Sequence, residues 1–279
     1  MASKRKLCLA TSGTFPLGEK EQLEKFKRVG INGFFSVYKS DEQIFDLCNH
    51  SQKLGLFFQS IHAMHLNMRG LWFDENESNF IAENFKKTIA CAHSSGVDRV
   101  VMHLYCGFLK ENPTKLGINK VSEILETAYK YGVKLCFENL EGANFLEAVL
   151  DEFKDNPYAR FCYDTGHENC YLGKSTVEKY IDRISVMHIN DNLGVRMPSL
   201  GINGKDDLHL LPFDGKVDFD RVADIVIKAG LKNELTFELK ISKDEASNKY
   251  RQMSFDEYLD LAFSRMKKFA NLVDNKLCK

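Results

Sequence analysis

The chain has 279 residues, of which 44% are hydrophobic, and its 38 basic side chains nearly balance its 39 acidic ones. This composition excludes a collagen-like or disordered protein, and the length suits one large α/β barrel or two modest domains. A net charge of -1 provides no general attraction for nucleic acid or for an anionic membrane. We therefore expect neither of them as a partner.

The cysteine pattern and the N-terminal segment both bear on the location of the protein. Its eight cysteines are scattered singly, without a C-x-x-C pair, as is typical of small core residues in a reducing compartment. The start MASKRKLCLA has too few apolar residues for a signal peptide, and no run approaches the roughly 18 apolar residues of a membrane span. These features predict a cytoplasmic protein.

Short apolar segments that are typical of buried strands alternate with longer amphipathic segments. Several amphipathic segments end in glycine just before the next strand, where helices commonly stop. The predicted strands are KLCLA (6–10), GFFSV (33–37), LFFQSI (56–61), RVVMH (99–103), VKLCFE (133–138), ARFCYD (159–164), SVMHI (185–189) and LTFEL (235–239).

This alternation indicates a parallel sheet that helices cover on both faces. Eight units of about 35 residues each favour one (β/α)8 barrel, a TIM barrel, as a single domain over 1–279. A C-terminal helical segment is expected at about 254–275. A doubly wound open sheet is the alternative, but the turn TSGTFPLGE after the first strand is neither a G-x-G-x-x-G motif nor a P-loop.

Five of the last six predicted strands end at or beside a residue that can bind a metal or transfer a proton. They are His103, Glu138, Asp164, His188 and Glu238. Such residues are costly to bury unpaired, and a shared cation would offset that cost. Because parallel strands of a barrel end at one rim, these side chains should converge where barrel active sites lie. We predict that the last four bind one divalent metal ion.

Further candidates lie in the loops just beyond the strand ends, and each has a plain alternative as a surface or turn residue. These loop candidates are His65, His167, Asp191, Asp207 and His209. His62 lies next to the predicted strand, one period from His65, and is interpreted as a structural residue rather than a ligand.

The segments FENLEG, CYDTGH, MHINDN followed by DLHLLPFDGKVDF, and TFELK resemble the xylose-isomerase-like TIM-barrel superfamily. This superfamily includes isomerases and epimerases of sugars and sugar phosphates, and also class II apurinic endonucleases. The resemblance covers residues 56–240 well and the first two strands loosely. In the isomerases and epimerases, residues after strands five to eight bind one divalent cation. The resemblance therefore implies the same ligand set as the strand ends, namely Glu138, Asp164, His188 and Glu238.

Three carboxylates and one imidazole favour Mn²⁺, with Mg²⁺, Co²⁺ or Zn²⁺ as alternatives. Our hypothesis is that a sugar or sugar phosphate chelates the ion and loses a proton, and that the cation stabilises the resulting enediolate. The resemblance suggests that Glu138 and Glu238 are the two bases. Return of the proton to the opposite face of the same carbon gives epimerisation, and return to the neighbouring carbon gives isomerisation.

Residues around this centre receive secondary roles. His167 would contact a substrate hydroxyl or order Asp164. Arg196 would hold substrate oxygens or a phosphate, or else be a solvated loop residue. Trp72 and Phe73, in the segment LNMRGLWFDENES, would form an apolar wall or lid against the sugar, anchor their loop to the barrel, or mediate a subunit contact.

The main alternative is a trinuclear zinc phosphodiesterase like the class II apurinic endonucleases. The resemblance provides a counterpart for each of the nine ligands of that class: His65, His103, Glu138, Asp164, His167, His188, Asp207, His209 and Glu238. The loops lack the clustered basic residues and apolar wedges that extrude a damaged nucleotide, so the isomerase or epimerase is favoured. A polyol or keto-acid dehydratase and a non-catalytic sugar-binding barrel are further alternatives. Family members are often dimers or tetramers, so a homo-oligomer is one expectation.

Overall fold

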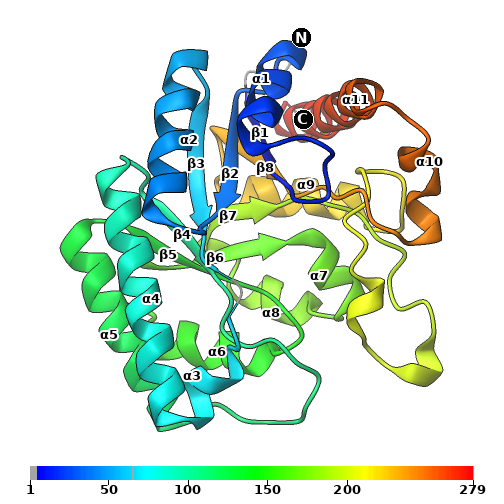
Figure 1. Ribbon diagram of the computed structural model, residues 1–279. Coiled ribbons are helices and arrows are strands. Elements are labelled where there is room, and N and C mark those ends of the chain that lie inside the picture. The colour runs from blue at the N-terminus through cyan, green and yellow to red at the C-terminus, as the bar shows by residue number, and fades with distance from the viewer. Residues whose placement is uncertain (1–4, 65, 279) are drawn as a thin grey trace.

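The computed structural model describes residues 5–64 and 66–278, in which helices surround eight parallel strands (Figure 1). The hydrogen-bonded order of the strands is β7-β6-β5-β4-β3-β2-β1-β8. Each of β2 to β6 lies between its neighbours in sequence, and β1 pairs with both β2 and β8. The strands are β1 (Lys6–Ala10), β2 (Gly33–Val37), β3 (Phe57–His62), β4 (Arg99–Met102), β5 (Lys134–Glu138), β6 (Ala159–Asp164), β7 (Ile184–His188) and β8 (Glu234–Phe237).

The two end strands of this order, β7 and β8, meet and nearly close the barrel. The amide of Ile189 donates to the carbonyl of Thr236 at 2.9 Å, and the amide of Glu238 donates to the carbonyl of Ile189 at 3.2 Å. The predicted (β/α)8 barrel is confirmed, with each strand within two residues of its predicted bounds. β8 ends at Phe237, two residues earlier than predicted, and the amide of Lys240 pairs with the carbonyl of His209 in a loop.

The helices begin and end largely at the signals that the sequence carries. Side chains of Ser40, Thr114 and Ser254 cap the first turns of α2, α5 and α11, and Gly30 and Gly132 end α1 and α5 with positive φ. The helices are α1 (Glu19–Val29), α2 (Asp41–Leu54), α3 (Arg69–Phe73), α4 (Glu75–Ser94), α5 (Lys115–Tyr131), α6 (Ala143–Glu152), α7 (Thr165–Cys170), α8 (Lys174–Lys179), α9 (Phe219–Lys228), α10 (Asn248–Arg251) and α11 (Phe255–Leu277), with short 3₁₀ turns η1 (Ile181–Arg183), η2 (Pro198–Leu200), η3 (Gly204–Asp206) and η4 (Glu245–Ser247).

The C-terminal helix α11 packs on its own barrel, beside α1 and α9 (Figure 1). Its buried stripe includes Leu259, Ala262 and Met266, whereas Phe255 and Phe263 are only partly buried. None of the helices in the described part of the chain combines the length and apolar character needed to cross a bilayer.

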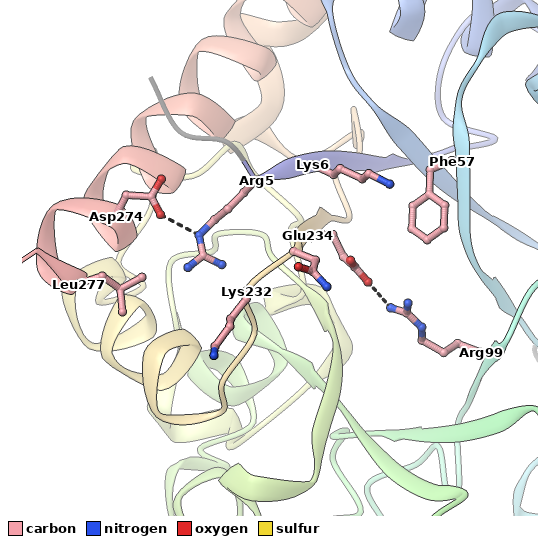
Figure 2. A pocket seen from close by; sticks show the side chains of 9 residues that line it. Arg5, Lys6, Phe57, Arg99, Lys232, Glu234, Asp274 and Leu277 are labelled. Atoms are coloured by element: carbon pink, nitrogen blue, oxygen red, sulfur yellow. Dashed lines mark hydrogen bonds and ion pairs between the residues drawn. The ribbon is translucent and has the colours of Figure 1, made fainter. Parts of the chain in front are cut away.

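The amino-terminal rim of the barrel is closed by charged residues (Figure 2). Arg99 at the start of β4 pairs with Glu234 at the start of β8, and Arg5 pairs with Asp274 of α11. A cavity of about 780 Å³ lies at this rim, and Lys6 is among the residues that line it. This cavity is at the opposite end of the strands from the predicted site residues.

Small side chains fill the barrel interior between the two rims. Val101, Cys136, Cys162 and Val186 form a separate buried cluster there, and all eight cysteines are free thiols. The space around Gly33 on β2 leaves no room for a side chain, since an added Cβ would lie 2.4 Å from the Phe57 carbonyl oxygen and 2.9 Å from the Cys8 Sγ.

We therefore expect Gly33→Ala to push β2 away from β3 and to lower the free energy of unfolding by about 1–3 kcal/mol. Chemical denaturation measures this loss. The control is Gly13→Ala, since no described atom lies within 4 Å of a Cβ at Gly13. Equal stability of the two variants would contradict the close packing at Gly33.

Candidate metal centre

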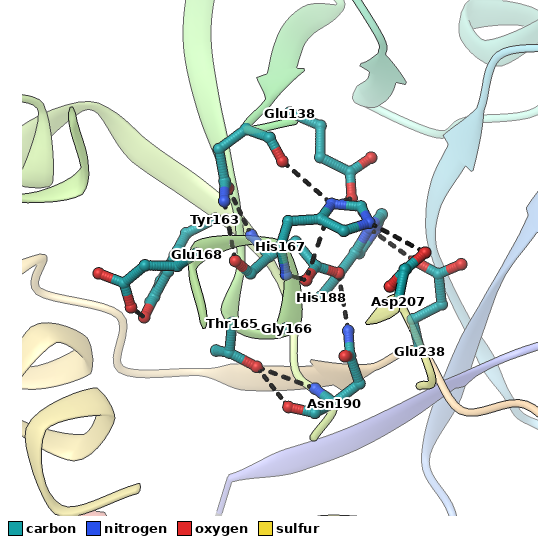
Figure 3. A network of polar contacts seen from close by, with 12 residues as sticks. Glu138, Tyr163, Thr165, Gly166, His167, Glu168, His188, Asn190, Asp207 and Glu238 are labelled. Carbon is teal, nitrogen blue, oxygen red and sulfur yellow. Dashed lines mark hydrogen bonds and ion pairs between the residues drawn. The ribbon is translucent and has the colours of Figure 1, made fainter. Parts of the chain in front are cut away.

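Four polar side chains converge at the carboxyl rim of the barrel. Glu138, Asp164 and His188 are the last residues of β5, β6 and β7, and Glu238 directly follows β8. One potential ligand atom from each lies within 4.8 Å of the other three. The Nδ1 atom of His188 is 2.9 Å from a Glu138 oxygen and 3.1 Å from a Glu238 oxygen (Figure 3). The strand ends therefore bring together the four residues that the sequence analysis selected.

Asparagine side chains and a helix start hold Asp164 in place. Its Oδ1 accepts a hydrogen bond from the amide of His167 at 2.7 Å, which caps α7, and its Oδ2 accepts one from Asn190 at 2.8 Å. Asn139 bonds to both the amide and the carbonyl of Asp164. The sequence analysis missed these two asparagines, although each directly follows or nearly follows a predicted strand end.

The ring of His188 is held by packing against an aromatic side chain. Its ring stacks on Phe35 with centroids 4.5 Å apart, and its Nε2 is buried without a hydrogen-bond partner among the described residues. Its Nδ1 faces oxygens of Glu138 and Glu238. A nitrogen lone pair and two carboxylates repel one another unless a proton or a cation lies between them, so this donor set fits a divalent ion.

The charges at the centre depend on burial and on these contacts. Burial opposes ionisation of Glu138, but His188 and His103 hold its pKa well below the ordinary value. Burial raises the pKa of Asp164 to about 6. Burial also opposes protonation of His188, but contacts with Cys162 and Glu138 raise its pKa well above the ordinary value. Protons therefore compete with any cation for this site.

A second group of side chains shares Glu138. The Nε2 atoms of His62 and His103 lie 3.2 and 3.0 Å from the same Glu138 oxygen. The sequence analysis interpreted His62 as structural, whereas the structure places its ring in this group, because β3 ends at His62 and not one residue earlier. The strand-end criterion that selected His103 would have found it. The predicted ligand His65 lies outside the described residues.

A third group lies beside the first and consists of His167, Asp207 and His209. Asp207 Oδ2 is 3.0 Å from His209 Nε2 and 3.4 Å from His167 Nε2. The Lys240 ammonium, which the sequence analysis did not single out, lies 2.8 Å from the same His209 nitrogen. The candidate Asp191 instead accepts backbone hydrogen bonds from its own loop and fixes the turn.

The guanidinium of Arg196 is held by residues of two loops at the carboxyl rim. Its guanidinium donates to Asp206 at 2.8 Å, to Asp244 at 2.9 Å and to the carbonyl of Lys205. Two of these bonds stay within the loop after β7, and the bond to Asp244 fastens that loop to the loop after β8. The predicted hold of Arg196 on substrate oxygens or a phosphate stays a prediction.

Trp72 anchors the segment that contains it, which was one of its predicted roles. Its indole is buried, donates to the carbonyl of Leu104 at 2.6 Å and packs on Phe145 at 4.8 Å. Gly117 of α5 lies against the ring. Trp72 and Phe73 were predicted to form an apolar wall or lid together. Phe73 is 36% exposed, so of this pair only Phe73 faces solvent.

An α/β barrel whose carboxyl rim gathers buried carboxylates and imidazoles belongs to the class of barrel proteins with a centre suited to a divalent ion. The family model of the xylose isomerase-like TIM barrel matches residues 23–255. The chain belongs to this family, which confirms the resemblance that the motifs indicated.

Individual relatives agree with this assignment. The uncharacterized protein y4fM of Sinorhizobium fredii is 34% identical over 118 residues, a match that spans 40% of this chain and 35% of that protein. The zinc-containing IOLI protein has the same fold, with a TM-score of 0.72, 19% identity and coverage of 97% of this chain and 98% of that one. D-allulose 3-epimerase from Methylomonas sp. has a TM-score of 0.69, 15% identity and coverage of 95% and 97%.

We expect divalent ions to stabilise the protein more strongly as the pH rises. Below pH 6 a proton neutralises Asp164, and the raised pKa of His188 keeps a proton on its ring into higher pH, so metal binding must displace both. An ion at about a hundred times its Kd adds about 2.7 kcal/mol. Thermal melts with Mn²⁺ or with chelator at several pH values measure the gain. A gain that is constant across pH would contradict these protonation states.

Gly117→Ala tests the anchoring of Trp72. Alanine in place of a helical glycine normally stabilises by about 1 kcal/mol. Here the Cβ would lie 2.0 Å from an indole carbon, so we expect a net loss of about 1–3 kcal/mol. Thermal melts should show it, with Gly204→Ala as the control, since no described atom lies near a Cβ at Gly204. A stabilised Gly117→Ala would disprove the tight contact.

Proposed function

We propose that the protein is a divalent-metal-dependent isomerase or epimerase of a sugar or sugar phosphate. The observation that carries this proposal is the meeting of two carboxylates, Glu138 of β5 and Glu238 after β8, at the Nδ1 atom of His188. Two bases from different strands around one point are what proton removal and return at a carbon require. The likeness to sugar epimerases in fold supports the same chemistry.

Glu138, Asp164, His188 and Glu238 would hold the ion, and the three carboxylates favour Mn²⁺ over Zn²⁺. When bound, a divalent ion supplies positive charge that stabilises negative charge on substrate oxygens. The protein residues supply the proton transfers. Despite burial, His188 and His103 hold the pKa of Glu138 well below the ordinary value, and Lys240 and His209 do the same for Glu238. Both carboxylates are therefore ionised at neutral pH, the form that a general base requires.

The two glutamates differ in their access to substrate. The Glu138 side chain is only 1% exposed and contacts histidines on several sides, whereas Glu238 is 16% exposed. We assign removal of the proton to one of them and its return to the other. Return to the same carbon inverts it, and return to the adjacent carbon isomerises an aldose and a ketose. His167, which contacts Asp164 through its amide, keeps that ligand oriented.

We place this reaction in the cytoplasm, since all eight cysteines are free thiols and a reducing compartment preserves them. The substrate class follows the sugars named for the structural relatives, such as D-allulose. Self-association, dehydration of a polyol or keto acid on the same centre, and sugar binding without catalysis stay predictions from the sequence.

One observation favours the second candidate function, a multinuclear phosphodiesterase. The groups around His62, around Glu238 and around Asp207 lie side by side, and Glu138 belongs to the first two. Such adjacent groups would suit several ions that act together on a phosphate. Cleavage of DNA containing an abasic site by the zinc-loaded protein would support this candidate and count against the isomerase.

Replacement of either base should stop the reaction. We expect Glu138→Gln and Glu238→Gln to lower proton exchange between substrate and solvent by at least about a hundredfold, since general base catalysis contributes that much. The measurement is deuterium incorporation from D₂O into a panel of free and phosphorylated ketoses and aldoses, with Mn²⁺ supplied. It detects proton removal even when the product is unknown.

The matched control is Glu126→Gln, which changes an exposed glutamate of α5. It should exchange deuterium as the unmodified protein does. Near-normal exchange by either Glu138→Gln or Glu238→Gln would rule out the two-base scheme. Exchange with none of the sugars, despite bound Mn²⁺, would count against the proposed function as a whole.

A further inference from the structure

Two neighbouring cavities lie at the amino-terminal rim of the barrel, at the far end of the strands from the candidate metal centre. Their volumes are about 780 Å³ and about 260 Å³, and the residues that line both are Arg99, Lys232, Asn233 and Glu234. The larger volume falls within the range of about 300–1,000 Å³ that is typical of small-molecule sites. The metal-dependent function proposed above uses neither cavity.

The residues around these cavities carry more positive than negative charge. The basic residues of the two linings are Arg5, Lys6, Arg99, Lys134 and Lys232, and the acidic ones are Glu234 and Asp274. Arg5 pairs with Asp274, and Arg99 pairs with Glu234. Figure 2 shows Lys6 and Lys232 at the larger cavity, and neither forms an ion pair with another residue that the structure describes. Because the whole protein has a net charge of -1, this positive charge is a local feature.

The alternation of side chains along the strands directs two of the basic residues into the barrel. Arg99 and Lys134 are the first residues of β4 and β5, two positions before Val101 and Cys136 of the interior cluster. Side chains two residues apart share one face of a strand, so Arg99 and Lys134 lie on the interior face. Asp98 contacts them at 3.0 and 3.4 Å. The charges that stay uncompensated are therefore those of Lys6 and Lys232.

A buried amide donor also lines the smaller cavity. Gln59 of β3 is 1% exposed, and its Oε1 accepts a hydrogen bond from the Ser60 hydroxyl at 2.6 Å. Its Nε2 is buried without a hydrogen-bond partner among the described residues. The register of β2 against β3 shifts here and leaves Gln59 without a partner residue on β2. Such bulges re-aim a side chain and are common at barrel rims and beside functional sites. The buried donor calls for an acceptor atom in the cavity.

We propose that the two cavities form a binding site for a phosphate group, either free or carried by a small metabolite. The Gln59 amide donates to a phosphate oxygen, and Lys232, which lines both cavities, contacts the same group. Lys232 and Lys6 together balance the charge of about −1.5 to −2 that a phosphate monoester carries. The larger cavity accommodates the rest of a metabolite beside Phe57. This site is separate from the metal centre, so the inference does not depend on the proposed function.

Isothermal titration calorimetry with inorganic phosphate and with AMP tests the proposal. The protein is first stripped with chelator, so that neither ligand binds through a divalent ion at the carboxyl rim. We expect both ligands to bind, with an affinity that falls as the salt concentration rises. Tighter binding of AMP would identify a phosphorylated metabolite as the ligand, and equal affinities would identify free phosphate. Absence of binding by both ligands at millimolar concentration would overturn the proposal.

Two variants locate the site. Gln59→Glu keeps an acceptor for Ser60 but replaces the donor with a carboxylate, so we expect it to weaken phosphate binding by at least about tenfold. Lys232→Met should weaken it by about threefold to tenfold, and because Lys232 is exposed, this variant tests the site even if circular dichroism shows that Gln59→Glu fails to fold.

The matched control is Lys243→Met, which removes the same charge from an exposed residue in the loop after β8, at the opposite rim. It should bind phosphate as the unmodified protein does. Unchanged phosphate affinity in Lys232→Met, or equal losses in Lys232→Met and Lys243→Met, would show that phosphate binds elsewhere and would overturn the proposal.

Discussion

The buried carboxylate of Glu138 is the feature on which the centre depends. Its two oxygens contact His62, His103 and His188, which stand at or beside the ends of β3, β4 and β7. A fourth imidazole, that of His167, lies 3.5 Å away. Histidines from separate strands therefore share one anion, and loss of that anion would leave several polar rings buried without their common partner.

The rest of the barrel holds this arrangement in place. The strands end at the same rim, where Asp164 of β6 pairs with His188 of β7, so residues distant in sequence become neighbours there. Asp191 and Arg196 fasten the long segment between β7 and α9, which delivers Asp207 and His209 to the centre. Ion pairs at the amino-terminal rim, such as that of Arg99, stabilise the opposite end. The candidate metal ligands thus lie at the carboxyl rim and the stabilising ion pairs at the amino-terminal rim, a division that other barrels of this type share.

The sequence was sufficient for the fold and for the four converging residues because both follow from periodicity. In this chain the predicted strand ends lie within two residues of the observed ones, and in a parallel barrel the strand ends share a rim. The predicted third strand stopped one residue before His62, so the strand-end criterion did not select this residue. The contacts of Arg196 and Lys240 depend on how loops fold back on one another, and neither periodicity nor spacing encodes them. The partner Asp244, for example, is 48 residues from Arg196.

The seam between β7 and β8 has a further consequence. These strands share few backbone bonds, chiefly around Ile189, whereas the other neighbouring pairs are joined along their ladders. His188 and Glu238 stand on opposite sides of that seam, 3.1 Å apart. An ion held by both residues would cross-link β7 and β8, the two end strands of the sheet. Local opening of the barrel between β7 and β8 would therefore be rarest with the ion bound and most frequent without it.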